Sequence, residues 1–225
     1  MRLKNGFTIA APCDVELIEL FQEIWIDRCY APWPLRLGPD DTVIDIGAHV
    51  GVFTVWAATQ YPASRIVAVE PLPDSFAVLR KNCQDSRLTT VDLLQSACGS
   101  RTGTAQLYSR GPTSMNTLYT IDALGSSFRA LSNVPVISLD DLLERFQIER
   151  PSLLKLDCEG AEYEILMNAS DTTLRRLRHI VMEYHIGLNS QSPQALARFL
   201  NEKGFETVIL PPRSEEDGYL YASLR

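Results

Sequence analysis

A short glycine-containing loop between two apolar segments constrains the fold of this chain more than any other feature. Residues 43–51 read Val-Ile-Asp-Ile-Gly-Ala-His-Val-Gly, and a second apolar segment at 67–69 ends on Glu70. This order is typical of a nucleotide-binding β-α-β unit, in which a strand, a glycine turn and a helix are followed by a second strand that ends on an acid. The glycines let the backbone approach a ligand closely, and the acid accepts hydrogen bonds from ribose hydroxyls. The sequence therefore predicts a parallel α/β sheet that binds a nucleoside-containing cofactor.

The loop departs from the dinucleotide-binding fingerprint at one informative position. Asp45 stands where Gly-x-Gly-x-x-Gly has its first glycine, and a carboxylate there would repel a pyrophosphate. A cationic ligand with a ribose and an amino acid, such as S-adenosylmethionine, would not be repelled. The chain also has no Tyr-x-x-x-Lys hydride-relay motif. The loop therefore favours a methyltransferase over a nicotinamide-dependent oxidoreductase. A non-catalytic relative would be expected to lose Gly47, Gly51 or Glu70, and all three are present.

Length and composition set loose bounds on the organisation of the chain. Its 225 residues, 45% of them hydrophobic, suffice for a single domain over 1–225. The net charge of -7 argues against a nucleic-acid partner or an anionic membrane. The five cysteines lack Cys-x-x-Cys spacing and indicate buried thiols in a reducing compartment. No signal peptide or spanning segment is visible, so we expect a cytoplasmic protein.

Helical and strand patterns alternate along the chain, which predicts a doubly wound, mostly parallel sheet with helices on both faces. Segment 1–39 is expected to hold an N-terminal helix from Asp14 and a proline-rich connector. Its stripe of Leu17, Phe21 and Trp25 either covers the sheet or forms a dimer face, so a homodimer stays open. Segment 109–135 is expected to be a long surface loop that is either functional or disordered. The remaining expected strands are 43–47, 66–70, 89–97, 152–157, 179–184, 205–210 and 219–224, with a small edge strand or hairpin at 102–108. The remaining expected helices are 51–60, 75–83, 139–146, 161 onward and 193–203.

Acidic residues follow several of the expected strands. Asp45, Glu70, Asp157 and Glu183 each lie at or near a strand end, where ligands bind in sheets of this kind. The strand that ends at Asp157 is expected to lie next to the first one. Lys155, inside that apolar strand, is costly to bury unless a carboxylate pairs with it. We expect Glu183 or Glu159 to be its partner.

In combination, these motifs resemble a known family. The segments VIDIGAHVGVFT, VAVEPLPDSFAVLRKN, ISLDDLL, LLKLDCEGAEYEIL and VMEYH, which span roughly residues 40–187, are similar to the FkbM-type S-adenosylmethionine-dependent methyltransferases. This resemblance implies a Rossmann-like, seven-stranded methyltransferase fold whose last strand is antiparallel. It also implies an O-methyltransferase that acts on a hydroxyl of a sugar, polyketide or other secondary metabolite.

The resemblance also assigns roles to residues of this chain. It places the cofactor loop at Asp45, Gly47 and Gly51, with His49 where asparagine is usual, and ribose binding at Glu70. From the resemblance we expect the segment around Gly111–Thr117 to be a loop that closes over the acceptor. The cofactor-binding set is completed by Pro71, Ser96, Ala97 and Asp157, and the substrate-binding set is Ser114, Met115 and Asn116.

Methyl transfer to an alcohol requires alignment of the oxygen and removal of its proton. The candidate catalytic residues are Asp157, Glu159, Glu183 and His185, the last because its near-neutral pKa suits proton uptake. Asp157, Glu159 and Glu183 also suit a hard cation, but no spacing motif demands a metal. We therefore predict no metal site and an activity that survives chelation. The expected partner is a small hydroxylated molecule.

Overall fold

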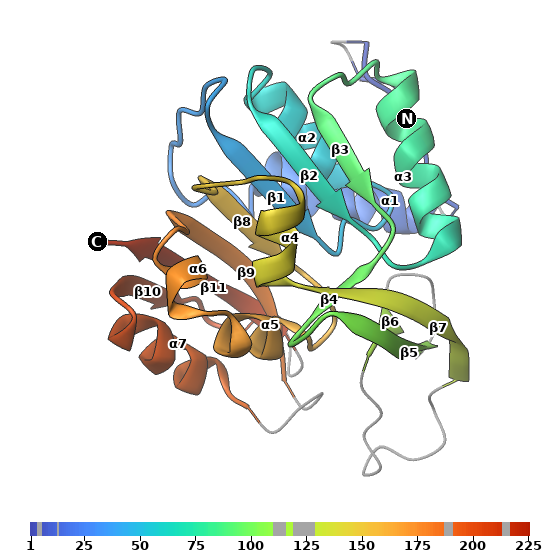
Figure 1. The fold of residues 1–225 in the computed structure, drawn as a ribbon. Coiled ribbons are helices and arrows are strands. Elements are labelled where there is room, and N and C mark those ends of the chain that lie inside the picture. Colours follow the sequence, from blue (N-terminus) through green and yellow to red (C-terminus); the bar gives the residue numbers. More distant parts are fainter. Residues whose placement is uncertain (4–5, 13, 110–115, 119–128, 187–190, 213–216) are drawn as a thin grey trace.

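A computed structural model gives the fold of this chain (Figure 1). It describes residues 1–3, 6–12, 14–109, 116–118, 129–186, 191–212 and 217–225, with only the backbone described at 14–16 and 116. A seven-stranded sheet has the order β10-β11-β9-β8-β1-β2-β3. Its strands are β1 (Thr42–Ile46), β2 (Arg65–Val69), β3 (Val91–Leu94), β8 (Leu153–Leu156), β9 (His179–His185), β10 (Phe205–Ile209) and β11 (Asp217–Leu224).

The strand directions confirm the predicted fold class. The pairs β8–β9, β1–β8, β1–β2 and β2–β3 are parallel, and β11 runs antiparallel to both of its neighbours. The chain therefore has the Rossmann-like methyltransferase sheet with an antiparallel last strand. In such a sheet the carboxyl ends of the parallel strands share one edge, and the strand order reverses beside β1.

Helices cover both faces of this sheet (Figure 1). One face packs against the N-terminal helix, α2 and α3, with Val43 and Ile66 pointing into that layer. The other face packs against α4, α5, α6 and α7, with Ile44 and Val67 pointing the opposite way. The alternation follows from the two-residue period of a strand buried on both sides. The helices are α2 (Val52–Gln60), α3 (Pro73–Asp85), α4 (Leu139–Arg145), α5 (Glu162–Asn168), α6 (Asp171–Leu174) and α7 (Pro193–Glu202).

The N-terminal helix differs in detail from the predicted one. Helix α1 (Asp14–Phe21) continues as a π-helical turn, η1 (Gln22–Ile26), instead of one regular helix. Such turns widen a helix locally and often occur at functional sites. Leu17 is buried in the core below, and Phe21 stacks on Trp25. Leu17 and Trp25 of the apolar stripe therefore pack toward the core, and the alternative of a dimer face stays a prediction.

A second sheet corrects two of the expected boundaries. The order β4-β7-β5-β6 joins β4 (Ala97–Gly99), β5 (Gly103–Ser109), β6 (Asn116–Thr117) and β7 (Arg129–Ser138). The expected strand 89–97 is thus two strands in different sheets, and part of the expected loop 109–135 is strand. Val134 and Val136 are buried at alternate positions, a pattern that the polar composition of the segment obscured.

No helix in the described ranges is long and apolar enough to cross a lipid bilayer.

Candidate active site

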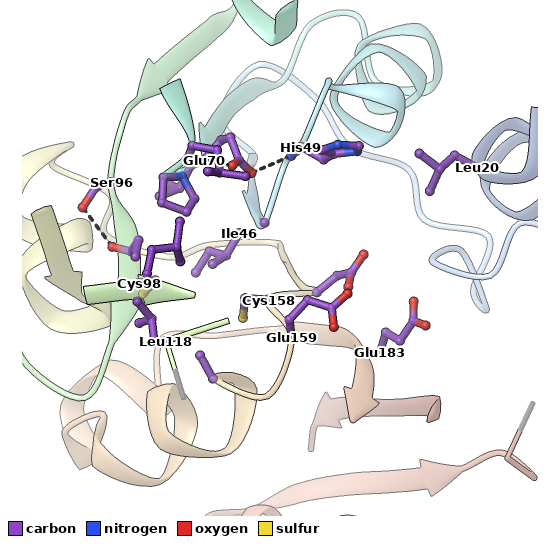
Figure 2. Close-up of a pocket in the computed structure, with 18 of the residues that line it drawn as sticks. Leu20, Ile46, His49, Glu70, Ser96, Cys98, Leu118, Cys158, Glu159 and Glu183 are labelled. Atoms are coloured by element: carbon purple, nitrogen blue, oxygen red, sulfur yellow. Dashed lines mark hydrogen bonds between the residues drawn. The ribbon is translucent and has the colours of Figure 1, made fainter. Parts of the chain in front are cut away.

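A cavity of about 250 Å³ lies at the carboxyl ends of the central parallel strands (Figure 2). One part of its wall is apolar and includes Ile46, Val69, Leu72, Cys98, Leu107 and Leu118. The opposite part is acidic and includes Asp157, Glu159 and Glu183. Leu20 of α1 and Glu23 of η1 complete the wall, so the N-terminal helix contributes to the cavity.

Two glycines shape the loop after β1. Gly47 has a φ of +76°, and a Cβ there would lie 1.7 Å from the carbonyl oxygen of Asp157. Gly51 has a φ of +88°, and its Cβ would lie 2.6 Å from Leu79 of α3. Only glycine tolerates both the dihedral angle and the close approach. Gly47 lines the cavity, whereas Gly51 does not and instead lets α2 pack against α3.

Glu70 follows β2 and holds this loop from the other side. Its Oε2 accepts a hydrogen bond from the backbone N–H of His49 at 2.9 Å, and its Oε1 accepts one from Leu72 at 2.9 Å (Figure 2). Burial raises the pKa of Glu70 to about 7, although the two amide hydrogen bonds act in the opposite direction. An ionised carboxylate has about four acceptor positions, so two remain for the hydroxyls of a ribose. The geometry therefore fits the ribose-binding role.

Beneath the loop lies a buried ion pair. The Lys155 ammonium is 3.1 Å from Asp45 Oδ1 and 3.7 Å from Asp157 Oδ2, and it donates to the carbonyl oxygen of Gly47 at 2.8 Å. Burial alone would lower the pKa of Lys155, but the Asp45 and Asp157 carboxylates outweigh burial and raise it. The expected partner, Glu183 or Glu159, was wrong. In the β1–β8 register, Asp45 lies directly opposite Lys155.

This placement changes the expected role of Asp45. Its side chain is fully buried, accepts a hydrogen bond from Thr54 at 2.6 Å and does not line the cavity. Asp45 is therefore positioned to hold the cofactor loop through Lys155, not to contact a ligand.

A buried tyrosine of the connector before β1 joins two acids of the cavity. The hydroxyl of Tyr30 lies 3.0 Å from Asp157 Oδ2 and 2.9 Å from Glu183 Oε2. Burial, reinforced by these two carboxylates, raises the pKa of Tyr30 well above its usual value, so it stays a donor. Burial raises the pKa of Asp157 too, but Lys155, His185 and the Tyr30 hydroxyl hold it below its ordinary value. Asp157 is therefore ionised at neutral pH.

His185 ends β9 behind this acidic wall. Its Nδ1 lies 3.1 Å from Oε1 of the fully buried Glu162, and its Nε2 lies 3.7 Å from Glu159 Oε2. Burial lowers the pKa of His185, but Glu162 and Glu159 outweigh it and raise the pKa well above the usual value. The imidazole is thus protonated at neutral pH and does not line the cavity. This geometry gives no support to its expected role as a proton acceptor.

The structure thus brings most, but not all, of the predicted site residues together. Besides the residues already placed, His49, Pro71, Ser96 and Ala97 line the cavity. Ser114 and Met115 lie outside the described residues, and Asn116 is described only as backbone in β6. Its neighbour Thr117 donates a hydrogen bond to the carbonyl oxygen of Glu159 at 2.6 Å. The second sheet therefore reaches the acidic loop after β8. No sequence signal identified Leu107 or Leu118 as part of the wall.

The charge of the cavity narrows the class of ligand. Its described lining includes the carboxylates of Glu23, Glu70, Asp157, Glu159 and Glu183, but no lysine or arginine. Such a wall disfavours the pyrophosphate of a dinucleotide and suits a cationic nucleoside, since like charges repel. Together with the strand order, this defines a methyltransferase that uses S-adenosylmethionine.

Comparison with known proteins confirms this class and gives the family. The family described as "Methyltransferase FkbM domain" matches residues 45–207. "Methyltransferase 1" of Beauveria bassiana is 31% identical, with 94% of this chain and 91% of that protein covered. The "31-O-demethyl-FK506 methyltransferase FkbM" of Streptomyces tacrolimicus is 30% identical, with 82% and 81% covered. The chain belongs to the FkbM methyltransferase family, and S-adenosylmethionine is its cofactor.

Solved structures agree on the fold. An FkbM methyltransferase from Methylobacillus flagellatus superposes with a TM-score of 0.58 at 13% identity, covering 95% of this chain and 56% of that one. A methyltransferase from Streptococcus mutans in complex with SAH gives a TM-score of 0.54 at 11% identity, covering 96% and 99%.

The pKa of Glu70 leads to a pH-dependent affinity. In the predicted ribose-binding role the hydroxyls would donate to the ionised carboxylate, and with a pKa of about 7 the ionised fraction rises as the pH increases. We expect the affinity for S-adenosylmethionine to increase about tenfold from pH 6 to pH 8. Calorimetry at several pH values measures this. Glu70→Gln should bind S-adenosylmethionine more weakly and lose the pH dependence. A wild-type affinity that does not change with pH would contradict the prediction.

Proposed function

We propose that this protein is an O-methyltransferase that transfers the methyl group of S-adenosylmethionine to a hydroxyl of a small molecule. The observation that carries the proposal is the row of carboxylates on one side of the cofactor cavity, at the ends of β8 and β9. A hydroxyl acceptor must lose its proton during transfer, and a carboxylate within reach can take it. The Streptomyces tacrolimicus relative is named as a methyltransferase of 31-O-demethyl-FK506, and a Haloferax volcanii relative, 27% identical, is a "Hexuronic acid methyltransferase".

The electrostatics separate the candidate proton acceptors. Asp157 is held ionised with a lowered pKa, which makes it a weak base, and His185 already carries its proton. An effective base has a pKa near the working pH. Excluding Asp157 and His185 leaves Glu159 and Glu183, the two other carboxylates of the acidic wall, as the proposed acceptors. Glu183 is the stronger candidate because Tyr30 fixes its carboxylate.

The chemistry requires little else of the protein. S-adenosylmethionine supplies an electrophilic methyl group. As the new O–CH₃ bond forms and the S–CH₃ bond breaks, the hydroxyl proton passes to the carboxylate. Tyr30 holds Asp157, and Lys155 holds the loop after β1. These contacts fix the carboxylates relative to the bound cofactor, and methyl transfer depends on such positioning.

A panel of acceptors tests the proposal. The protein is incubated with S-adenosylmethionine and separate sets of sugars, hexuronides and hydroxylated polyketides, and products are detected by mass spectrometry as the gain of one methyl group. We expect O-methylated product from at least one set, and none with Glu70→Ala at the same cofactor concentration. Methylation of amines or carbon atoms alone would point to another acceptor atom. Cofactor binding without any product would favour a non-catalytic binding module.

A further inference from the structure

The loop after β8 and the end of β9 bring together a set of side chains that the proposed function does not fully use. Asp157, Glu159 and His185 each offer a ligand atom, and these atoms lie within 4.8 Å of one another. β8 and β9 are adjacent parallel strands, so the two carboxylates and the imidazole meet at one edge of the sheet. We propose that these three residues bind a divalent metal cation at the acceptor end of the cavity.

The spacing suits a single ion. Two ligands of one cation lie at most two bond lengths apart, about 4.2 Å for Mg²⁺ and about 5 Å for Ca²⁺. The three ligand atoms already lie within 4.8 Å, so small side-chain movements complete the site. Tyr30 and Lys155 both contact Oδ2 of Asp157, which leaves Oδ1 for a cation.

The orientation of His185 is the one that a metal ligand in this cluster needs. Glu162 is fully buried, and its oxygens also accept hydrogen bonds from the backbone N–H groups of Cys158 at 2.7 Å and Gly160 at 2.9 Å. Held in this way, Glu162 fixes the Nδ1 side of His185 and turns Nε2 toward Glu159. A buried carboxylate behind a histidine is the usual support of a metal-bound imidazole. His185 is itself only 8% exposed.

The donor set indicates the class of ion. One imidazole and two carboxylates suit first-row divalent cations such as Mn²⁺, Fe²⁺ or Zn²⁺, whereas Mg²⁺ and Ca²⁺ prefer oxygen alone. A cation here would also offset the repulsion among Asp157, Glu159 and Glu183. It would polarise an acceptor hydroxyl and make its proton easier to remove. This use of the ion rests on the proposed function, but its binding does not.

The proposal departs from the metal-free site that the sequence analysis predicts. That analysis grouped Asp157 and Glu159 with Glu183, whereas the ligand atoms that converge are those of Asp157, Glu159 and His185. Glu183 is instead held by Tyr30.

Mn²⁺ titration of the full chain tests the site directly. The protein is stripped with EDTA, dialysed and titrated with Mn²⁺ at pH 8, because a histidine ligand must give up its proton. Free Mn²⁺ is followed by electron paramagnetic resonance. We expect one bound ion per chain, and affinities lower by about tenfold or more in Glu159→Gln and His185→Gln. Glu183→Gln, which removes the same charge without removing a ligand, should bind Mn²⁺ nearly as tightly as the wild type.

One further measurement keeps the outcome decisive. S-adenosylmethionine binding, measured by calorimetry on every variant, shows that each is folded, and it tests the cofactor site separately from the metal. Wild-type protein that binds the cofactor but no Mn²⁺ would overturn the metal proposal and leave the proposed function intact. Equal losses in Glu159→Gln and Glu183→Gln would also overturn it, because a general electrostatic field would then explain the binding.

Discussion

Replacing Glu183 by glutamine is expected to lower turnover by about 10²–10⁴-fold, the usual cost of removing a general base. Glu183 lies near the carboxyl end of β9, lines the acidic wall of the cavity and receives a hydrogen bond from Tyr30 at 2.9 Å. Glutamine keeps the shape of the side chain and can still accept that hydrogen bond, so only the capacity to take up a proton is lost. Single-turnover methylation with saturating cofactor and acceptor measures the effect.

The matched controls separate chemistry from binding. Affinity for S-adenosylmethionine should stay within roughly threefold of wild type, because a group that acts only in the transition state leaves ground-state binding unchanged. Tyr30→Phe keeps both carboxylates and loses only the shared hydroxyl, so its turnover should fall less than that of Glu183→Gln. A normal turnover of Glu183→Gln would contradict the prediction. Glu159 or solvent would then have to accept the proton, and positioning of the substrates would account for the rate.

The sheet and the cofactor loop were predictable because they depend on local patterns. Continuous apolar strands, a glycine turn and an acid at the next strand end are visible in residues 43–70, and their chemistry follows from backbone geometry. The family resemblance added the antiparallel last strand. Gly47 shows the limit of such reasoning: the sequence indicates close approach of a ligand, whereas the structure adds close approach of the Asp157 carbonyl group.

The features that sequence analysis missed depend on pairing between distant segments. Tyr30 lies in the proline-rich connector, yet it bridges two acids more than 120 residues away in the chain. The partner of Lys155 follows from the register of β1 against β8, which no local pattern reveals. The behaviour of His185 depends on Glu162, a helix residue whose carboxylate is turned inward to the loop after β8. The structure was therefore needed to establish the register between neighbouring strands and the contacts of polar groups that face inward.

Replacing Lys155 by methionine is expected to lower the free energy of unfolding by about 3–5 kcal/mol, because breaking a buried pair leaves an uncompensated charge. Asp45, fully buried, would keep only its hydrogen bond from Thr54 among the contacts described here. The affinity for S-adenosylmethionine should also fall, because the Lys155 ammonium holds the carbonyl oxygen of Gly47. Denaturant unfolding and cofactor calorimetry measure the two effects.

The double variant Asp45→Asn, Lys155→Met separates the unpaired charge from lost packing. Asparagine can still accept the hydrogen bond from Thr54, and the charge of the fully buried Asp45 is then removed together with that of Lys155. We expect the double variant to be more stable than Lys155→Met alone, which is the signature of two directly coupled residues. Its affinity for S-adenosylmethionine should nevertheless stay low, because the donor to Gly47 is still missing. If the two substitutions were simply additive in unfolding free energy, Asp45 and Lys155 would not act as a pair, and the loop would need another support.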